Sequence, residues 1–209
     1  MTYLFIILYA ITLIYFALSE RTKKFVWLLA IQGLILFGVV FFSLNKIDIF
    51  DFIFILLETI VVKTLVVPWF LNKVRKHNQL KREHEPYVPV FYSIIVVVII
   101  LIISFMLSNY LNDSQMHTQY FTIAFTSIIF GGYFIMIHKN LFSNVVGYLI
   151  IENGIFLLSL AVGSIMPIMV NLAILLDVFM GVLILGLFIN RVGDTFKSVK
   201  TEHLSKLKD

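Results

Sequence analysis

The sequence has no cysteine and few charged residues. The absence of thiols excludes disulfide bonds, cysteine-ligated iron–sulfur clusters and thiolate zinc sites. The five histidines include no His-x-x-x-His pair, so we expect neither a metal nor any other cofactor on this chain. Charged residues make up only 13% of the 209 positions, whereas soluble domains contain about 25%. This scarcity argues against a soluble domain.

Apolar residues are abundant instead, at 60% of the chain with a mean hydropathy of +0.99. A membrane-spanning helix needs about 20 consecutive apolar residues. The sequence offers seven such segments, which predict an all-α polytopic membrane protein, a bundle of about seven transmembrane helices. The predicted spans are Thr2–Leu18, Phe25–Leu44, Phe50–Leu71, Val88–Tyr110, Gln119–Ile137, Leu141–Val162 and Ile168–Asn190. No basic region precedes the first segment, so we expect a span there and not a removable signal.

The basic residues gather in alternate connections. Residues 19–24, residues 72–87, Lys139 and the C-terminal tail hold nearly all of them, and only Lys46 lies on the opposite side. Basic residues concentrate on the cytoplasmic side of membrane proteins, so we predict an N-terminus outside and a C-terminus in the cytoplasm of a cell (inner or plasma) membrane. The net charge of +4 is then explained by basic residues on the cytoplasmic side of a protein embedded in the lipid bilayer, and we expect no nucleic acid as a partner.

The largest basic connection divides the predicted chain. A three-helix membrane part (residues 1–71) precedes a basic cytoplasmic loop (72–87), and a four-helix part (88–190) precedes a basic cytoplasmic tail (191–209). The loop either sets the orientation of the chain or contacts anionic lipid or an acidic partner.

Four ionisable residues lie inside the predicted spans: Glu58, Lys63, Glu152 and Asp177. At ~1.5 Å per helical residue, Lys63 and Glu152 lie roughly 13 Å from the inner ends of their spans, and the other two roughly 20 Å. Ionisable groups inside a membrane are costly and commonly mark ion or proton pathways. We therefore predict that these residues contribute to a proton path.

Lys63 requires a partner on another helix. Glu58 precedes it by five residues and lies about 140° away around an α-helix, whereas Glu152 matches its depth. The pair has two interpretations: a structural ion pair, or a lysine that relays protons because burial disfavours its charged form. Pro68 follows closely, and we expect it to kink the helix and release the Thr64 carbonyl.

Two further features concern the same path. His138 ends the fifth predicted span, where it would either collect protons, because imidazole titrates near neutral pH, or serve as an interfacial residue without a special role. Asp177 is flanked by Ala173 and Gly181, small residues that allow another helix to approach closely. The short connection between the last two spans predicts that Glu152 and Asp177 lie near one cleft.

The residues around Glu152 carry a family resemblance. Residues 147–154 read Gly-Tyr-Leu-Ile-Ile-Glu-Asn-Gly, residues 138–141 His-Lys-Asn-Leu, and residues 63–68 Lys-Thr-Leu-Val-Val-Pro. With residues 173–178, Ala-Ile-Leu-Leu-Asp-Val, they resemble the E component (HyfE) of hydrogenase-4-type membrane complexes. The likeness covers nearly the whole chain. The last three spans are similar to the K component of respiratory complex I and to the C component of Mrp-type antiporters.

The resemblance implies a function. In those proteins two adjacent helices each carry a carboxylate implicated in proton movement. Glu152 matches the first and Asp177 the second, with Asp where complex I has Glu, and its side chain reaches about one methylene less. Lys63 matches a lysine of the family's third span, whereas Glu58 has no counterpart.

The implied protein is a non-redox membrane subunit of a hydrogenase-4-like or complex-I-like oxidoreductase, assembled with antiporter-like subunits. The redox centres would lie on other chains. Two alternatives stay open: a subunit of an Mrp-type cation/proton antiporter without a redox partner, and a purely structural linker within such a complex.

Overall fold

The computed structural model describes residues 2–43, 53, 56–77, 87–111 and 117–161. These residues form α-helices and one π-helical segment, and no β-strand occurs among them. The elements are α1 (Thr2–Leu18), α2 (Thr22–Ser43), η1 (Leu57–Val66), α4 (Val67–His77), α5 (Val90–Tyr110), α6 (Thr118–Ile137) and α7 (Leu141–Ala161).

The helix bounds follow hydrophobicity closely. Helices α1, α5, α6 and α7 match predicted spans to within two residues, and α2 begins at Thr22 instead of Phe25. The third span differs: η1 continues without a break into α4, which ends at His77, so the predicted basic loop begins as helix. The seventh predicted span, with Asp177, lies outside the described residues.

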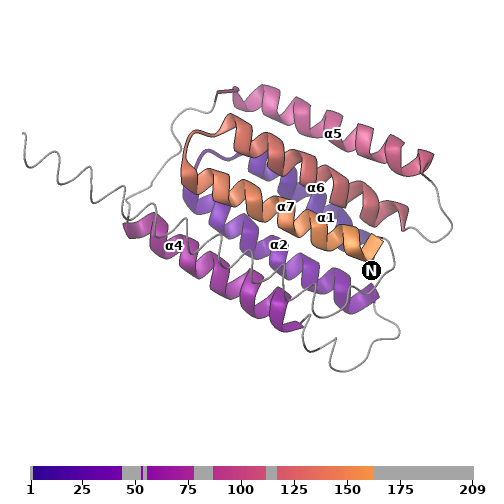
Figure 1. The fold of residues 1–209 in the computed structure, drawn as a ribbon, viewed down its shortest axis with the longest axis horizontal. Helices are drawn as coiled ribbons and strands as arrows, with labels where there is room; N and C mark the ends of the chain where they lie inside the picture. The colour runs from indigo at the N-terminus through magenta and orange to yellow at the C-terminus, as the bar shows by residue number, and fades with distance from the viewer. Residues whose placement is uncertain (1, 44–52, 54–55, 78–86, 112–116, 162–209) are drawn as a thin grey trace, which may run out of the picture.

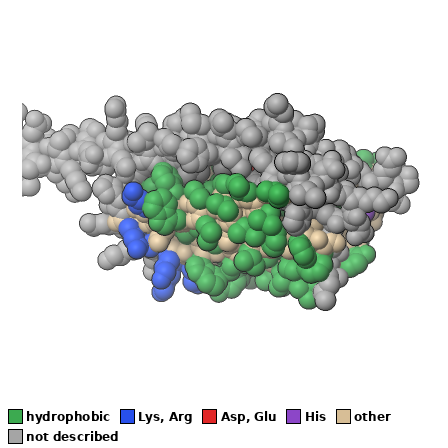
Figure 2. Space-filling view, turned by 90° about the horizontal axis from the view of Figure 1, so that it is seen from below, with side chains coloured by type: hydrophobic (Ala, Val, Ile, Leu, Met, Phe, Trp, Pro, Cys, Tyr) green, Lys and Arg blue, Asp and Glu red, His purple; other side chains and the backbone are tan. Residues whose placement is uncertain are grey.

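Four of the described helices, α2, α5, α6 and α7, are long and apolar enough to cross a membrane. Helix α1 is equally apolar but has 17 residues. The exposed side chains are also largely apolar, including those of Trp27, Phe91 and Met106. Figure 2 shows hydrophobic side chains over much of the described surface of one face. Length, composition and surface together indicate an all-α membrane protein.

The helices pack side by side along one direction (Figure 1). Helix α1 packs against α2, α5 and α6, and α2 packs against α7, η1 and α4. The α6–α7 interface is the most extensive. Helices α4 and α5 consequently lie on opposite sides of the bundle (Figure 1).

Basic residues gather at one end of this bundle. Helices α1, α4 and α6 end there, and α2 and α7 begin there. Apart from Lys63, all Lys and Arg residues of the described ranges lie at this end: Arg21, Lys23, Lys24, Lys73, Arg75, Lys76 and Lys139. Figure 2 shows the Lys and Arg side chains of one face collected there. This is the asymmetry on which the predicted orientation rests.

Glycines allow α6 and α7 to approach closely. A Cβ atom on Gly147 would lie 3.0 Å from the Gly131 carbonyl oxygen and 2.6 Å from an Ile135 side-chain carbon. A Cβ on Gly154 would lie 2.9 Å from the carbonyl oxygen of Ala124. Small residues at helix interfaces give such contacts in membranes. Gly131 takes part in the same contact from α6, because a Cβ there would lie 2.7 Å from the Gly147 carbonyl oxygen, whereas Gly132 has nothing within 4 Å.

Candidate functional site: a buried ion pair beside a polar network

The π-helical segment η1 carries Lys63 into the bundle. Its bonding connects residues five apart: the Val67 N–H donates to the Val62 carbonyl, and the Thr64 hydroxyl donates to the Thr59 carbonyl at 2.8 Å. Pro68 is the second residue of α4, which continues directly from η1, so its missing N–H removes one backbone donor from the continuous helix. The chain thus changes from π-helical to α-helical bonding beside Pro68. Segments of this kind are rare and frequently lie at functional sites.

Gly33 of α2 fixes how closely η1 approaches. A Cβ atom at this position would lie 2.7 Å from Thr64 Oγ1 and 3.0 Å from the Lys63 carbonyl carbon. Only a hydrogen atom fits between the two backbones. The glycine therefore places the backbone of Lys63 directly against α2, and the Lys63 side chain reaches α7 from there.

Lys63 and Glu152 form an ion pair between η1 and α7. Lys63 Nζ lies 2.6 Å from Glu152 Oε1, and each side chain is only 7% exposed. The ring of Phe156, one turn beyond Glu152, has its centroid 4.5 Å from the same nitrogen. The partner predicted for Lys63 from depth is confirmed. Burial also excludes a lysine that extends to the membrane surface.

Burial makes the stability of this pair depend on the presence of both charges. Two charges taken out of water lose several kcal/mol each in hydration, and close contact between them offsets most of that loss. The Phe156 ring adds a favourable interaction with the ammonium, about 0.5–2 kcal/mol for such geometries. The arrangement is stable as a pair, whereas either charge alone would be strongly disfavoured. It can therefore hold a charge pair or exchange a proton, provided that the two groups can separate.

The π-helical bonding changes one geometric prediction. The 140° separation of Glu58 and Lys63 assumed an α-helix, but both positions lie in η1. With bonds between residues five apart, such positions stack nearly one above the other, as residues four apart do in an α-helix. The α-helical estimate is therefore wrong here, and positions 58 and 63 lie toward the same side of the segment.

His138 occupies the basic end of the bundle. Its ring is buried between Phe134, at 4.0 Å between centroids, and Phe25, at 5.9 Å. Its Nδ1 lies 2.8 Å from the Phe134 carbonyl, which can only accept, so this nitrogen carries a proton and donates. Glu152 lies roughly 16 Å farther along α7 than Leu141, at 1.5 Å per residue. The described contacts do not bring His138 and the ion pair together.

A buried hydrogen-bond network adjoins the pair. The Asn153 amide, next to Glu152, donates to Gln32 Oε1 at 3.2 Å, and Gln32 Nε2 donates to the Thr12 hydroxyl at 3.0 Å. Thr12 in turn donates to the Tyr9 carbonyl at 2.6 Å. The side chains of Asn153, Gln32 and Thr12 are all buried. The network joins α7, α2 and α1 at the level of the ion pair.

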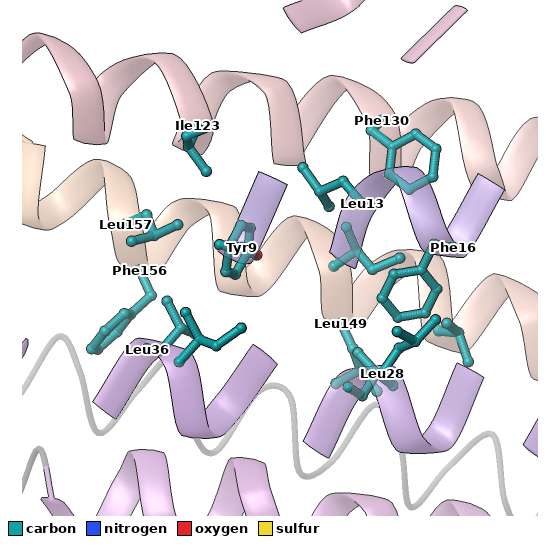
Figure 3. Packing of buried hydrophobic residues seen from close by; sticks show 14 of the residues in the cluster. Tyr9, Leu13, Phe16, Leu28, Leu36, Ile123, Phe130, Leu149, Phe156 and Leu157 are labelled. Carbon is teal, nitrogen blue, oxygen red and sulfur yellow. The ribbon is translucent and has the colours of Figure 1, made fainter. Parts of the chain in front are cut away.

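Tyr9 extends the polar region toward α6. Its hydroxyl lies 3.0 Å from Ser127 Oγ, and Ser127 donates to the Ile150 carbonyl at 2.9 Å. Tyr9 is fully buried and lies within electrostatic range of Glu152. Figure 3 shows its ring among Leu13, Leu36 and the other apolar side chains of the core. Four helices therefore meet through neutral polar groups beside one charged pair.

Sequence reasoning missed this network. A usable signal was the presence of amide side chains, Gln32 and Asn153, deep inside apolar segments, where unsatisfied amides are costly. In the part of the chain that the structure describes, no group of three or more His, Asp or Glu side chains could hold a metal ion. No family model, curated protein or solved structure matches this chain.

Proposed function

We propose that the chain is a non-redox membrane subunit of a hydrogenase-4-like or complex-I-like oxidoreductase, and that Lys63 and Glu152 belong to its proton path. The observation that carries this proposal is the buried ion pair between η1 and α7. A charge pair inside apolar helices is costly, and such residues are characteristic of proton routes. The family resemblance around residues 147–154 supports the same function.

In this proposal the ion pair opens and closes. While Lys63 and Glu152 are in contact, each stabilises the charged form of the other. Separation leaves two buried charges without compensation, so the carboxylate would bind a proton and the lysine would release one. The π-helical bonding of η1 supports such movement, because a return to α-helical bonding would turn Lys63 relative to α7.

The remaining predicted residues complete the proposed route. Asp177 would exchange protons with Glu152 from the neighbouring span. Glu58 shares the π-helical segment with Lys63, and His138 would connect the route to the basic end. We propose the seven-span arrangement with a cytoplasmic C-terminus in the cell membrane, and antiporter-like subunits as partners.

The test is proton translocation by the assembled complex with Glu152→Gln. We expect normal assembly, judged by co-purification of the partner subunits, but at least a tenfold loss of protons moved per electron transferred. Glu152→Asp keeps the charge while withdrawing it by one methylene, so partial translocation should remain. Unchanged translocation in both variants would remove Glu152 from the path.

The closed ion pair supports one other function, that of a structural linker between antiporter-like subunits. A contact of 2.6 Å suits a permanent cross-link between η1 and α7 as well as it suits a switch. A linker predicts that Lys63→Met with Glu152→Met assembles and translocates protons normally. A proton path predicts assembly without translocation.

A further inference from the structure

A surface groove runs between α1 and α2, apart from the ion pair. Its volume is about 750 Å³, and apolar side chains from both helices form most of its lining. Lys23 and Lys24 stand at its end on the basic side of the bundle. An elongated apolar groove with two cations at one end has the chemical pattern of an anionic amphiphile.

The length of the groove matches one membrane leaflet. On α2 its lining runs from Lys23 to Ile35, which corresponds to roughly 18 Å at 1.5 Å per residue. The hydrocarbon core of a bilayer is about 30 Å thick, so one leaflet provides about 15 Å. The lysines would therefore lie at headgroup level while the apolar part follows an acyl chain toward the bilayer centre.

The side chains at headgroup level and those nearer the bilayer centre both fit a lipid bound in this groove. Trp27 is 66% exposed near the lysines, where tryptophan prefers the boundary between water and lipid. Lys24 Nζ lies 5.5 Å from the centroid of the Tyr15 ring. Thr12 is the polar residue of the deeper part, but its hydroxyl already donates to Tyr9 and accepts from Gln32. The deep part thus suits a hydrocarbon chain and not a polar head.

We propose that this groove binds an anionic phospholipid from the leaflet at the basic end, with its headgroup on Lys23 and Lys24 and an acyl chain between α1 and α2. The assignment rests on charge complementarity at one end and on the leaflet-length apolar lining beyond it. It is independent of the proton path.

The test uses the full chain in nanodiscs that contain equal amounts of phosphatidylglycerol and phosphatidylcholine with identical acyl chains. Lipids retained after extraction into mild detergent are counted by native mass spectrometry. The groove variant is Lys23→Gln with Lys24→Gln, and the control is Lys73→Gln with Lys76→Gln, on α4 at the same end. We expect wild-type protein and control to retain phosphatidylglycerol preferentially.

The groove variant should lose this retention about fivefold for each lysine removed, as expected for basic residues near anionic lipid. A second variant, Ile31→Trp, fills the groove without changing charge and should also reduce retention. Three results would overturn the proposal: equal retention of both lipids, equal losses in groove and control variants, or no retained lipid because a protein segment covers the groove.

Discussion

Replacing the ion pair with apolar side chains should destabilise the protein only when one partner is replaced. Lys63→Met leaves Glu152 as a buried carboxylate without its cation, and Glu152→Met leaves a buried ammonium. Loss of one partner of a buried pair costs about 3–5 kcal/mol, whereas replacement of both by apolar groups of similar volume is often neutral or stabilising. Both side chains are 7% exposed, so little solvent is present to replace a lost partner.

The double variant is therefore expected to unfold at nearly the wild-type free energy. Methionine suits the exchange because its unbranched side chain adapts to irregular spaces. With each single variant costing about 3–5 kcal/mol and the double variant about zero, the interaction energy from the four-protein cycle should be about 6–10 kcal/mol, above the usual range for residues in contact. Unfolding in mixed micelles of mild detergent and dodecyl sulfate, followed by circular dichroism, measures each free energy.

Lys73→Met provides the matched control. Lys73 is an exposed lysine of α4, so its replacement should change the unfolding free energy by less than about 0.5 kcal/mol. Additive single-variant costs would refute the reasoning, because they would show that Lys63 and Glu152 do not stabilise one another. So would single variants that behave like the control.

Two further predictions concern packing and the neutral network. Gly147→Ala should destabilise the protein by about 1–3 kcal/mol, because the added methyl group meets the backbone of α6. Gly132→Ala is the control in the same unfolding assay: a Cβ there has nothing within 4 Å, so the change should be neutral or slightly stabilising. Gln32→Leu should cost about 1–3 kcal/mol, because it leaves the buried Asn153 amide and Thr12 hydroxyl each without one partner; stability equal to wild type would show that these bonds do not form.

The positions of the helices were predictable because the lengths of the apolar segments set them. The span 141–162 was predicted from apolar composition, and α7 covers Leu141–Ala161. Depth counting also predicted the partner of Lys63, since an axial rise of 1.5 Å per residue holds well enough over two or three turns. Both inferences needed only positions along a helix axis.

Rotation about the helix axis was not predictable in the same way. In η1 the backbone bonds to the fifth residue and not to the fourth, beside the close contact with Gly33 and before the proline that follows. The hydrophobic periodicity of a single segment contains no information about such contacts. The partners of Gln32 likewise depend on which faces of α1 and α7 turn toward α2. Sequence indicates that such amides need partners, but only the assembled bundle selects them.

The neutral network and the ion pair differ in how firmly they hold their helices. Asn153 is bonded to α2, and the Ile150 carbonyl is bonded to Ser127 of α6, so α7 is held on two sides immediately next to Glu152. Lys63, by contrast, belongs to the π-helical segment η1, and π-helical bonding is rare and frequently lies at functional sites. A proton switch requires one fixed and one movable partner, because two fixed groups could never separate and two mobile groups would lose the pair's specific geometry. In the proposed proton path, Glu152 would therefore be the fixed group and Lys63 the moving one, so a substitution that favours α-helical bonding in η1 should disturb translocation more than one that weakens the network.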